Sequence, residues 1–267
     1  MIFKKISWLF KRHPFLYKAR FKLLSKNSDI SDIKNQTYNK TNDKQDIPKY
    51  FYEINDVIFK NFKPQTDLEL IQHLSIWLQD NIKGGPGLSE PSDEALRIML
   101  AGNGGVCSDI AQIFNNFCVI NDVKVREWGN TRAPFSKDYG GHSFNEVYIE
   151  HLKKWILIDV SCSLLFYYDD SALSVIELYQ LIREDKQIVF NSFNSKQAVD
   201  NKNIKRNYLN PNIVPFLICN YSNKLYDAYL RFFRPYIPVF IIHFIIFSIG
   251  KSYHYRFPID NYKKIFA

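Results

Sequence analysis

The stretch of sequence that decides the fold of this chain is GNGGVCSDIAQIF, residues 102–114. Its glycines allow a sharp turn before Cys107, and apolar side chains then recur at helical spacing. The stretch therefore predicts a helix that begins at Cys107. Unpaired N–H groups and the helix dipole at such an end favour an anion, so we expect the pKa of this thiol to be lowered. The same N–H groups can hold an oxyanion.

Other interpretations of this segment are weaker. A phosphate-binding loop would end in Gly-Lys-Ser/Thr, and no lysine follows these glycines. A single cysteine also fits a small core residue, because free cysteine is often buried. The chain has four cysteines, none in a Cys-x-x-Cys pair, so we expect neither a disulfide framework nor a zinc site. No motif indicates a cofactor.

Two stretches of alternating residues follow, HSFNEVYI from His142 and KKWILIDV from Lys153, and they predict an antiparallel hairpin. With the turn centred just after Glu150, paired residue numbers sum to 301. His142 then lies opposite Asp159 on one face of the sheet. The opposite face collects Val147, Ile149, Ile156 and Ile158. A shift of one residue would lose both the pairing and the apolar face.

In nucleophilic catalysis by cysteine, a carboxylate orients a histidine, and the histidine deprotonates the thiol or pairs with the thiolate. At the motifs GGVCSDIA, GHSFNEVYI and WILIDVS the chain resembles the transglutaminase-like family. The resemblance covers roughly residues 60–165. It implies an α+β, papain-like core in which a helix with the cysteine packs on an antiparallel sheet with the histidine and aspartate. It also implies that Cys107 is the nucleophile, His142 the general base and acid, and Asp159 the residue that orients the histidine.

The resemblance also implies a class of chemistry. Family members include protein cross-linking enzymes, peptidases and amide hydrolases, and some have lost activity. We expect a cysteine-dependent enzyme that acts on a peptide, protein or other amide or ester through a thioester. Hydrolysis is the default, because water is always present. Two alternatives stay open: an amine-accepting acyltransferase, and a non-catalytic binding or scaffold protein with this fold.

The charge of the chain is concentrated at its N-terminus. The chain has 35 Lys and Arg and 27 Asp and Glu, which gives a net charge of +8. Residues 1–50 alone hold 12 of the basic and 4 of the acidic residues, which is also a net charge of +8. Residues 1–26 contain no acid. The apolar residues near the start predict an amphipathic helix that ends before Pro14; they are Ile2, Phe3, Ile6, Leu9 and Phe10. This helix fits an anionic membrane surface, and it also fits packing on the body with lysines in water.

The arrangement and location of the chain follow from the same pattern. We expect a basic arm and polar linker over residues 1–48, a catalytic core over 49–170, and a helical, aromatic-rich extension over 171–267 packed on the core. Because only the arm is basic, no nucleic acid is expected as a partner. A secretory signal fits poorly, and a mitochondrial presequence fits less well than a membrane-surface helix, so we expect a cytoplasmic protein, peripheral on the inner face of the membrane. The apolar segment 236–249 is either core or membrane-contacting.

Overall fold

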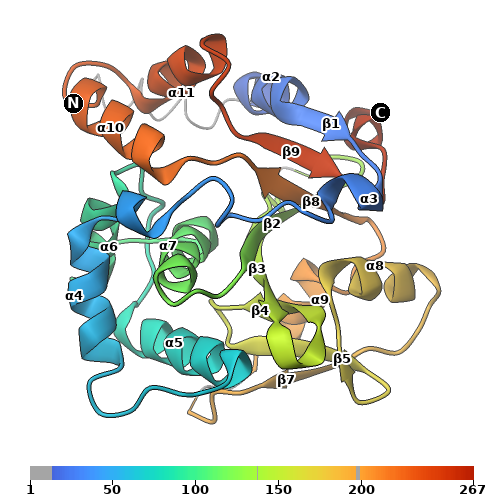
Figure 1. The fold of residues 1–267 in the computed structure, drawn as a ribbon. Helices are drawn as coiled ribbons and strands as arrows, with labels where there is room; N and C mark the ends of the chain where they lie inside the picture. Colours follow the sequence, from blue (N-terminus) through green and yellow to red (C-terminus); the bar gives the residue numbers. More distant parts are fainter. Residues whose placement is uncertain (1–13, 137, 197–198) are drawn as a thin grey trace.

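The computed structural model describes residues 14–136, 138–196 and 199–267, and its centre is one sheet (Figure 1). In these residues nine strands form the order β1-β9-β8-β2-β3-β4-β5-β6, and β7 pairs with β5. All neighbouring pairs are antiparallel except β1 and β9. The expected amphipathic helix near the start lies outside the described residues.

The strands are β1 Ser25–Asn27, β2 Val125–Arg132, β3 His142–Ile149, β4 Lys154–Asp159, β5 Leu164–Tyr168, β6 Ser171–Ala172, β7 Val189–Ser192, β8 Ile213–Cys219 and β9 His254–Phe257. The helices are α2 Pro14–Leu24, α3 Ile30–Ile33, α4 Lys49–Ile58, α5 Asp67–Asn81, α6 Ser92–Leu100, α7 Cys107–Ile120, α8 Val175–Arg183, α9 Asn201–Asn207, α10 Asn223–Phe233 and α11 Val239–Ser248. The 3-10 turns are η1 Lys44–Asp46, η2 Glu150–Leu152 and η3 Tyr262–Phe266.

Helices cover both faces of the sheet, so strand residues of either parity are buried (Figure 1). Helices α4 to α7 pack on one face around Phe114, Phe117 and Val147. Helices α8 and α9 pack on the other face around Trp128 and Phe144. A third apolar cluster joins α2, α10 and α11 to β8 and β9. The α+β architecture expected from the sequence is therefore observed, with α7 packed directly on β2 and β3.

The register of the predicted hairpin is wrong by two residues. Strands β3 and β4 pair Glu146 with Leu157 and Val147 with Ile156, so paired numbers sum to 303 and not 301. The reason is the turn: η2 and Lys153, which has a positive φ of 49°, make a four-residue connection where a two-residue turn was expected. Because side chains alternate with a period of two, this shift keeps every residue on its predicted face.

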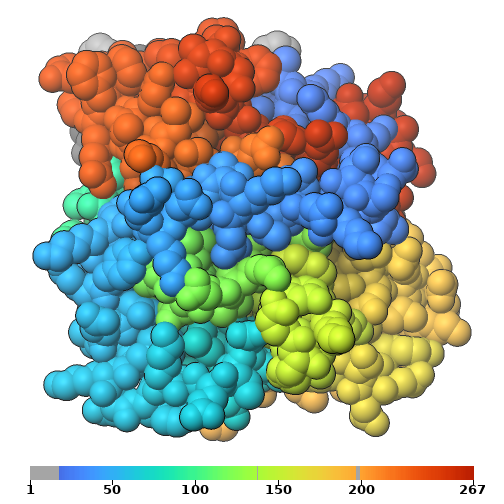
Figure 2. Space-filling view, viewed as in Figure 1, coloured from blue at the N-terminus to red at the C-terminus, as the bar shows by residue number. Residues whose placement is uncertain are grey.

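The expectation that the part of residues 1–48 after the basic arm is only a polar linker is also wrong. Strand β1 pairs in parallel with β9, and the segment after it crosses one face of the molecule between the C-terminal extension and the core helices (Figure 2). Ile33 and Ile47 are buried. Arg126 of β2 donates hydrogen bonds to the carbonyls of Ile33 and Lys34, both at 2.7 Å. A long basic side chain thus fixes a polar segment that has few apolar residues of its own.

The C-terminal extension does more than pack on the core, because β8 and β9 continue the sheet from β2. The segment 236–249 contains α11, whose Ile242 and Ile246 are fully buried, while Phe244 on the same helix is 62% exposed. One face of this helix is therefore core and the other faces solvent. Among the described helices, none combines the length and apolar character needed to cross a membrane. The three-part domain division stays a prediction.

Candidate active site

Two glycine loops place Cys107 at the first residue of α7. Gly85 donates a backbone hydrogen bond to the carbonyl of Gly105, and Gly105 donates one to that of Pro86, both at 2.9 Å. Gly105 has a φ of 108°, a backbone conformation that is strained for residues with a side chain, so glycine is favoured there. The side chain of Asp109 accepts the Val106 N–H at 2.9 Å and closes the turn. The predicted start of this helix at Cys107 is confirmed.

The structure brings the three predicted site residues together. His142 Nε2 lies 2.9 Å from Asp159 Oδ2, although β3 and β4 have the shifted register. Asp159 Oδ1 accepts the N–H of Ser161 at 2.9 Å. Nε2 is occupied by Asp159, so Nδ1 is the ring nitrogen left to act on Cys107, whose pKa His142 lowers. His142 and Asp159 are both buried, and Cys107 is half-buried.

The electrostatics of the three groups favour a thiolate–imidazolium pair. Burial raises the pKa of Cys107, but the hydrogen bond and charge of His142 and the N–H of Ser143 lower this pKa below its ordinary value. Burial lowers the pKa of His142, whereas the charge and hydrogen bond of Asp159 raise it to about 10. Burial raises the pKa of Asp159, but the contacts with His142 lower this pKa by more than burial raises it. The carboxylate therefore stays ionised.

A fourth residue, Tyr208, belongs to this cluster and was not found from the sequence. Its hydroxyl donates to Asp159 Oδ2 at 2.8 Å and lies 3.1 Å from His142 Nε2. Tyr208 is buried against Phe144 and Phe166, just after α9 in the C-terminal extension. The sequence around this tyrosine is rich in Asn and Lys and carries no local signal for a site residue. Its hydrogen bond lowers the pKa of Asp159 and helps to fix the carboxylate that orients His142.

Replacing Tyr208 by phenylalanine is expected to lower the free energy of unfolding at pH 7 by about 2 kcal/mol, because a hydrogen bond to a buried carboxylate is lost. The alkylation rate of Cys107 at pH 6.5 should fall several-fold, since Asp159 then orients the imidazole less well. Urea unfolding and iodoacetamide kinetics measure the two effects. Tyr167→Phe is the control, because Tyr167 on β5 is half-buried and packs on the face of the sheet opposite to Tyr208. An unchanged alkylation rate in Tyr208→Phe would show that the hydroxyl only fills space.

Three polar side chains near the site have roles in the fold. Glu146 accepts from Trp128 Nε1 at 3.1 Å and pairs with Arg126 at 3.2 Å. Asn145 donates to the carbonyl of Ala111 at 3.0 Å. Cys162 lies near Asp159, and burial together with that carboxylate raises the pKa of its thiol. None of these side chains contributes a second nucleophile.

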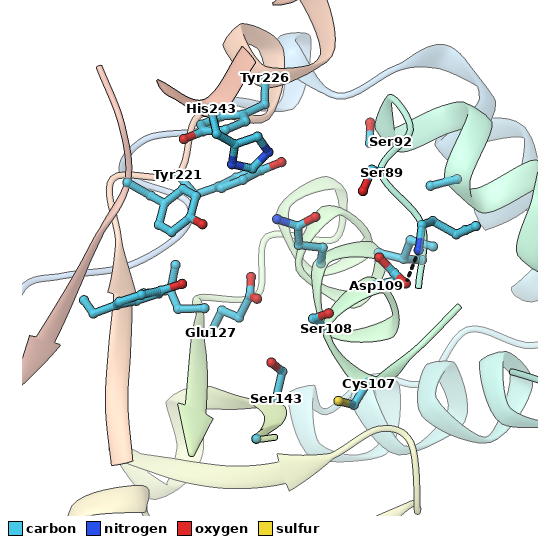
Figure 3. Close-up of a pocket in the computed structure, with 18 of the residues that line it drawn as sticks. Ser89, Ser92, Cys107, Ser108, Asp109, Glu127, Ser143, Tyr221, Tyr226 and His243 are labelled. Carbon is cyan, nitrogen blue, oxygen red and sulfur yellow. Dashed lines mark hydrogen bonds between the residues drawn. The ribbon is translucent and has the colours of Figure 1, made fainter. Parts of the chain in front are cut away.

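Cys107 opens into a cavity of about 400 Å³, named here the Cys107 cavity (Figure 3). His142, Ser143 and Gly141 line it beside the thiol, and Glu127 lines it farther in. Figure 3 shows Cys107 and Ser143 at one end, and Tyr221, Tyr226 and His243 gathered at the other. The cavity is thus large enough for a substrate group to lie next to the thiol.

A comparison with known protein families matches part of this chain. Residues 57–160 match the family model of the transglutaminase-like superfamily, which is less than half of the chain. The match confirms the resemblance seen in the motifs and the fold class of this segment, and at the level of the superfamily it supports a cysteine-dependent enzyme. Strands β8 and β9, α9 and Tyr208 all lie outside the matched residues.

One solved structure is similar over a limited region. It is a candidate cysteine protease from Cytophaga hutchinsonii, with 19% sequence identity and a TM-score of 0.33. The similarity covers 42% of this chain and 37% of that one, so well under two thirds of either protein is matched. No curated protein matches the sequence.

Proposed function

Because residues 57–160 form a transglutaminase-like core, we propose that this protein is a cysteine-dependent acyl-transfer enzyme that hydrolyses an amide or an ester. The observation that supports the proposal is that His142, which is hydrogen-bonded to Asp159, lowers the pKa of Cys107, and that Cys107 and His142 both line one cavity. A scaffold protein would have no need of a thiol with a lowered pKa beside an imidazole with a raised one.

In the proposed reaction the Cys107 thiolate attacks the carbonyl carbon, and a C–S bond forms. The carbonyl oxygen becomes an oxyanion next to the first turn of α7, whose N–H groups have no carbonyl partner within the helix. The C–N or C–O bond then breaks, and the leaving group takes the proton of the His142 imidazolium. This step leaves a thioester on Cys107 and a neutral imidazole.

Water resolves the thioester in the second half of the reaction. His142 accepts a proton from the attacking water, the C–S bond breaks, and the acid product leaves. Protonated His142 and the Cys107 thiolate are thereby restored. A primary amine could take the place of water, and that transfer reaction is the alternative to hydrolysis.

The test is a search for the thioester. The wild-type protein is incubated with a cell lysate, quenched in acid and analysed by mass spectrometry for an acyl adduct on Cys107, with Cys107→Ala as the control. An adduct on Cys107 that a biotinylated alkylamine does not intercept supports hydrolysis. Transfer of the acyl group to that amine would support the transferase alternative, and the absence of any adduct would favour a binding protein.

We also propose that the enzyme works at an anionic membrane surface. The N-terminal arm carries the charge for this contact. Exposed aromatic residues lie on α10, on α11 and in the turn between them, and these two helices pack in one apolar cluster with α2. Phe232 is 68% exposed and Tyr236 80% exposed. Aromatic rings of this kind enter the interface of a bilayer, while lysines contact its headgroups.

Replacing Lys4, Lys5, Lys11 and Arg12 by glutamine is expected to weaken binding to phosphatidylserine vesicles by more than about tenfold, since each basic residue contributes about 1 kcal/mol near such a surface. Residues 14–26 must stay, because Phe21 and Leu24 are buried. Vesicle sedimentation measures the effect, and phosphatidylcholine vesicles are the control. High salt should remove only part of the binding. Equal sedimentation of the substituted and wild-type proteins would argue against the arm as the contact.

A further inference from the structure

The Cys107 cavity contains a buried carboxylate that the proposed reaction does not use. Glu127 lies on β2 and is 3% exposed. Its Oε2 accepts a hydrogen bond from Asn115 Nδ2 at 2.9 Å, and Asn145 in turn fixes Asn115 at 2.8 Å. Among the described residues, Asn115 is the one hydrogen-bond donor found for this carboxylate, and it bonds Oε2 and not Oε1. Figure 3 shows the carboxylate between the thiol end and the aromatic end of the cavity.

The other buried glutamate of the sheet shows what Glu127 lacks. Glu146 on β3 is also almost inaccessible, but it pairs with Arg126 and accepts three hydrogen bonds in total. Glu127 has no basic partner among the described residues. Burial, together with the charges of Asp109 and Cys107, raises the pKa of Glu127 to about 8, although the hydrogen bond from Asn115 lowers it. A cation beside Oε1 would offset this cost.

The remaining carboxylates that line the cavity are already used within the fold. Asp109 closes the turn before α7 and also accepts the Leu88 N–H at 3.0 Å. Asp227 accepts the N–H and hydroxyl of Ser92 at 2.7 and 2.6 Å. Glu90 pairs with Arg234. Among the carboxylates that line the cavity, Glu127 is therefore the one that neither pairs with a basic residue nor holds a turn or a helix end.

Aromatic rings lie farther along the same cavity. Tyr221 and Tyr226 stack with centroids 4.5 Å apart, and Tyr253 lies 5.8 and 5.7 Å from them. The Tyr221 and Glu127 side chains interact electrostatically, so the two parts of the cavity adjoin. Arg20 donates to the Tyr255 hydroxyl at 3.3 Å and supplies positive charge at this aromatic end. Because Arg20 makes the aromatic end positive, a cationic group would lie next to Glu127, between the thiol and the tyrosines.

We propose that Glu127 recognises a positively charged group of the substrate, an ammonium or a guanidinium, inside the Cys107 cavity. The inference rests on the proposed function and adds a class of substrate to it. A protonated amine has no free electron pair and cannot attack a thioester. The cation that Glu127 holds is therefore a part of the substrate that is recognised, and it differs from an acyl acceptor.

The test measures the charge preference at the thiol and needs no knowledge of the substrate. Two methanethiosulfonate reagents of similar size, one with a trimethylammonium and one with a sulfonate, form a mixed disulfide with the Cys107 thiolate and release methanesulfinate. Their rate ratio, cationic over anionic, is divided by the ratio for free cysteine. The measurement is made at pH 9, above the pKa of Glu127. The titratable groups that face Glu127 are Cys107, Asp109, Tyr38 and Tyr221.

For the wild-type protein we expect the corrected rate ratio to favour the cationic reagent. For Glu127→Gln we expect this ratio to fall about tenfold, because the substitution removes a negative charge close to the thiol, and such a charge is only partly screened inside a protein. Glu150→Gln is the matched control, since Glu150 is exposed at the far end of β3 and pairs with Lys124 there. Its ratio should stay within about twofold of the wild type. The wild-type ratio should also rise between pH 7 and pH 9 as Glu127 ionises, which tests the same idea without a substitution.

The outcomes separate the two proposals. A ratio that Glu127→Gln leaves unchanged, with Cys107 still reactive, would overturn the inference and leave the proposed function standing. A Cys107 that reacts with neither reagent would overturn both. A ratio that falls equally in both variants would show that net charge alone sets the preference, and that result also counts against a site at Glu127.

Discussion

Iodoacetamide at pH 6.5 is expected to modify Cys107 at least about 100-fold faster than any of the other three cysteines. The thiolate is the reactive form, and His142 lowers the pKa of Cys107. Burial raises the pKa of Cys118 well above its ordinary value and that of Cys219 to about 12. Mass spectrometry of the labelled peptides over time gives the four rates.

The pH dependence of this labelling has a defined sign. As pH falls through the lowered pKa of Cys107, the thiolate takes up a proton and the rate declines. As pH rises past about 10, His142 loses its proton, so turnover should fall while alkylation continues. Labelling in urea is the control, because unfolding should make all four rates similar. Faster labelling of Cys162 or Cys219 in the folded protein would contradict the assignment of the nucleophile.

Replacing His142 by alanine is expected to reduce the alkylation rate of Cys107 at pH 6.5 by about 100-fold or more. Without His142, burial raises the pKa of Cys107 and less of the thiol is present as the reactive thiolate. Adduct formation in the lysate experiment should be lost, because both proton transfers depend on the imidazole. Asp159→Asn should also reduce both rates, since the amide favours the wrong tautomer of His142.

The control for these variants is His151→Ala, because His151 lies exposed in the turn between β3 and β4. Its rate should equal that of the wild type. Thermal unfolding checks that each variant is folded. Full reactivity of Cys107 in folded His142→Ala would mean that the helix end alone activates the thiol.

The sequence by itself determined the helix that begins at Cys107 and the shared face of His142 and Asp159. Both depend on local rules, since glycines and an apolar period of 3.6 mark a helix start, and a period of two assigns strand faces. The face assignment stayed right although the register was wrong, because an error of two residues preserves parity. The turn geometry that sets the register depends on the backbone of residues 150–153 and not on the strand pattern.

Only the tertiary structure decided which distant side chains complete the site. Tyr208 is one of 17 tyrosines, and nothing in its neighbourhood of the sequence distinguishes it. It reaches Asp159 because α8 and α9 cover the second face of the sheet. Glu127 shares a strand face with the buried Val125, and the Cys107 cavity and α7 enclose its charged side chain. Alternation predicts which face a side chain takes, whereas the packing of remote segments determines whether that face meets water, a core or a cavity.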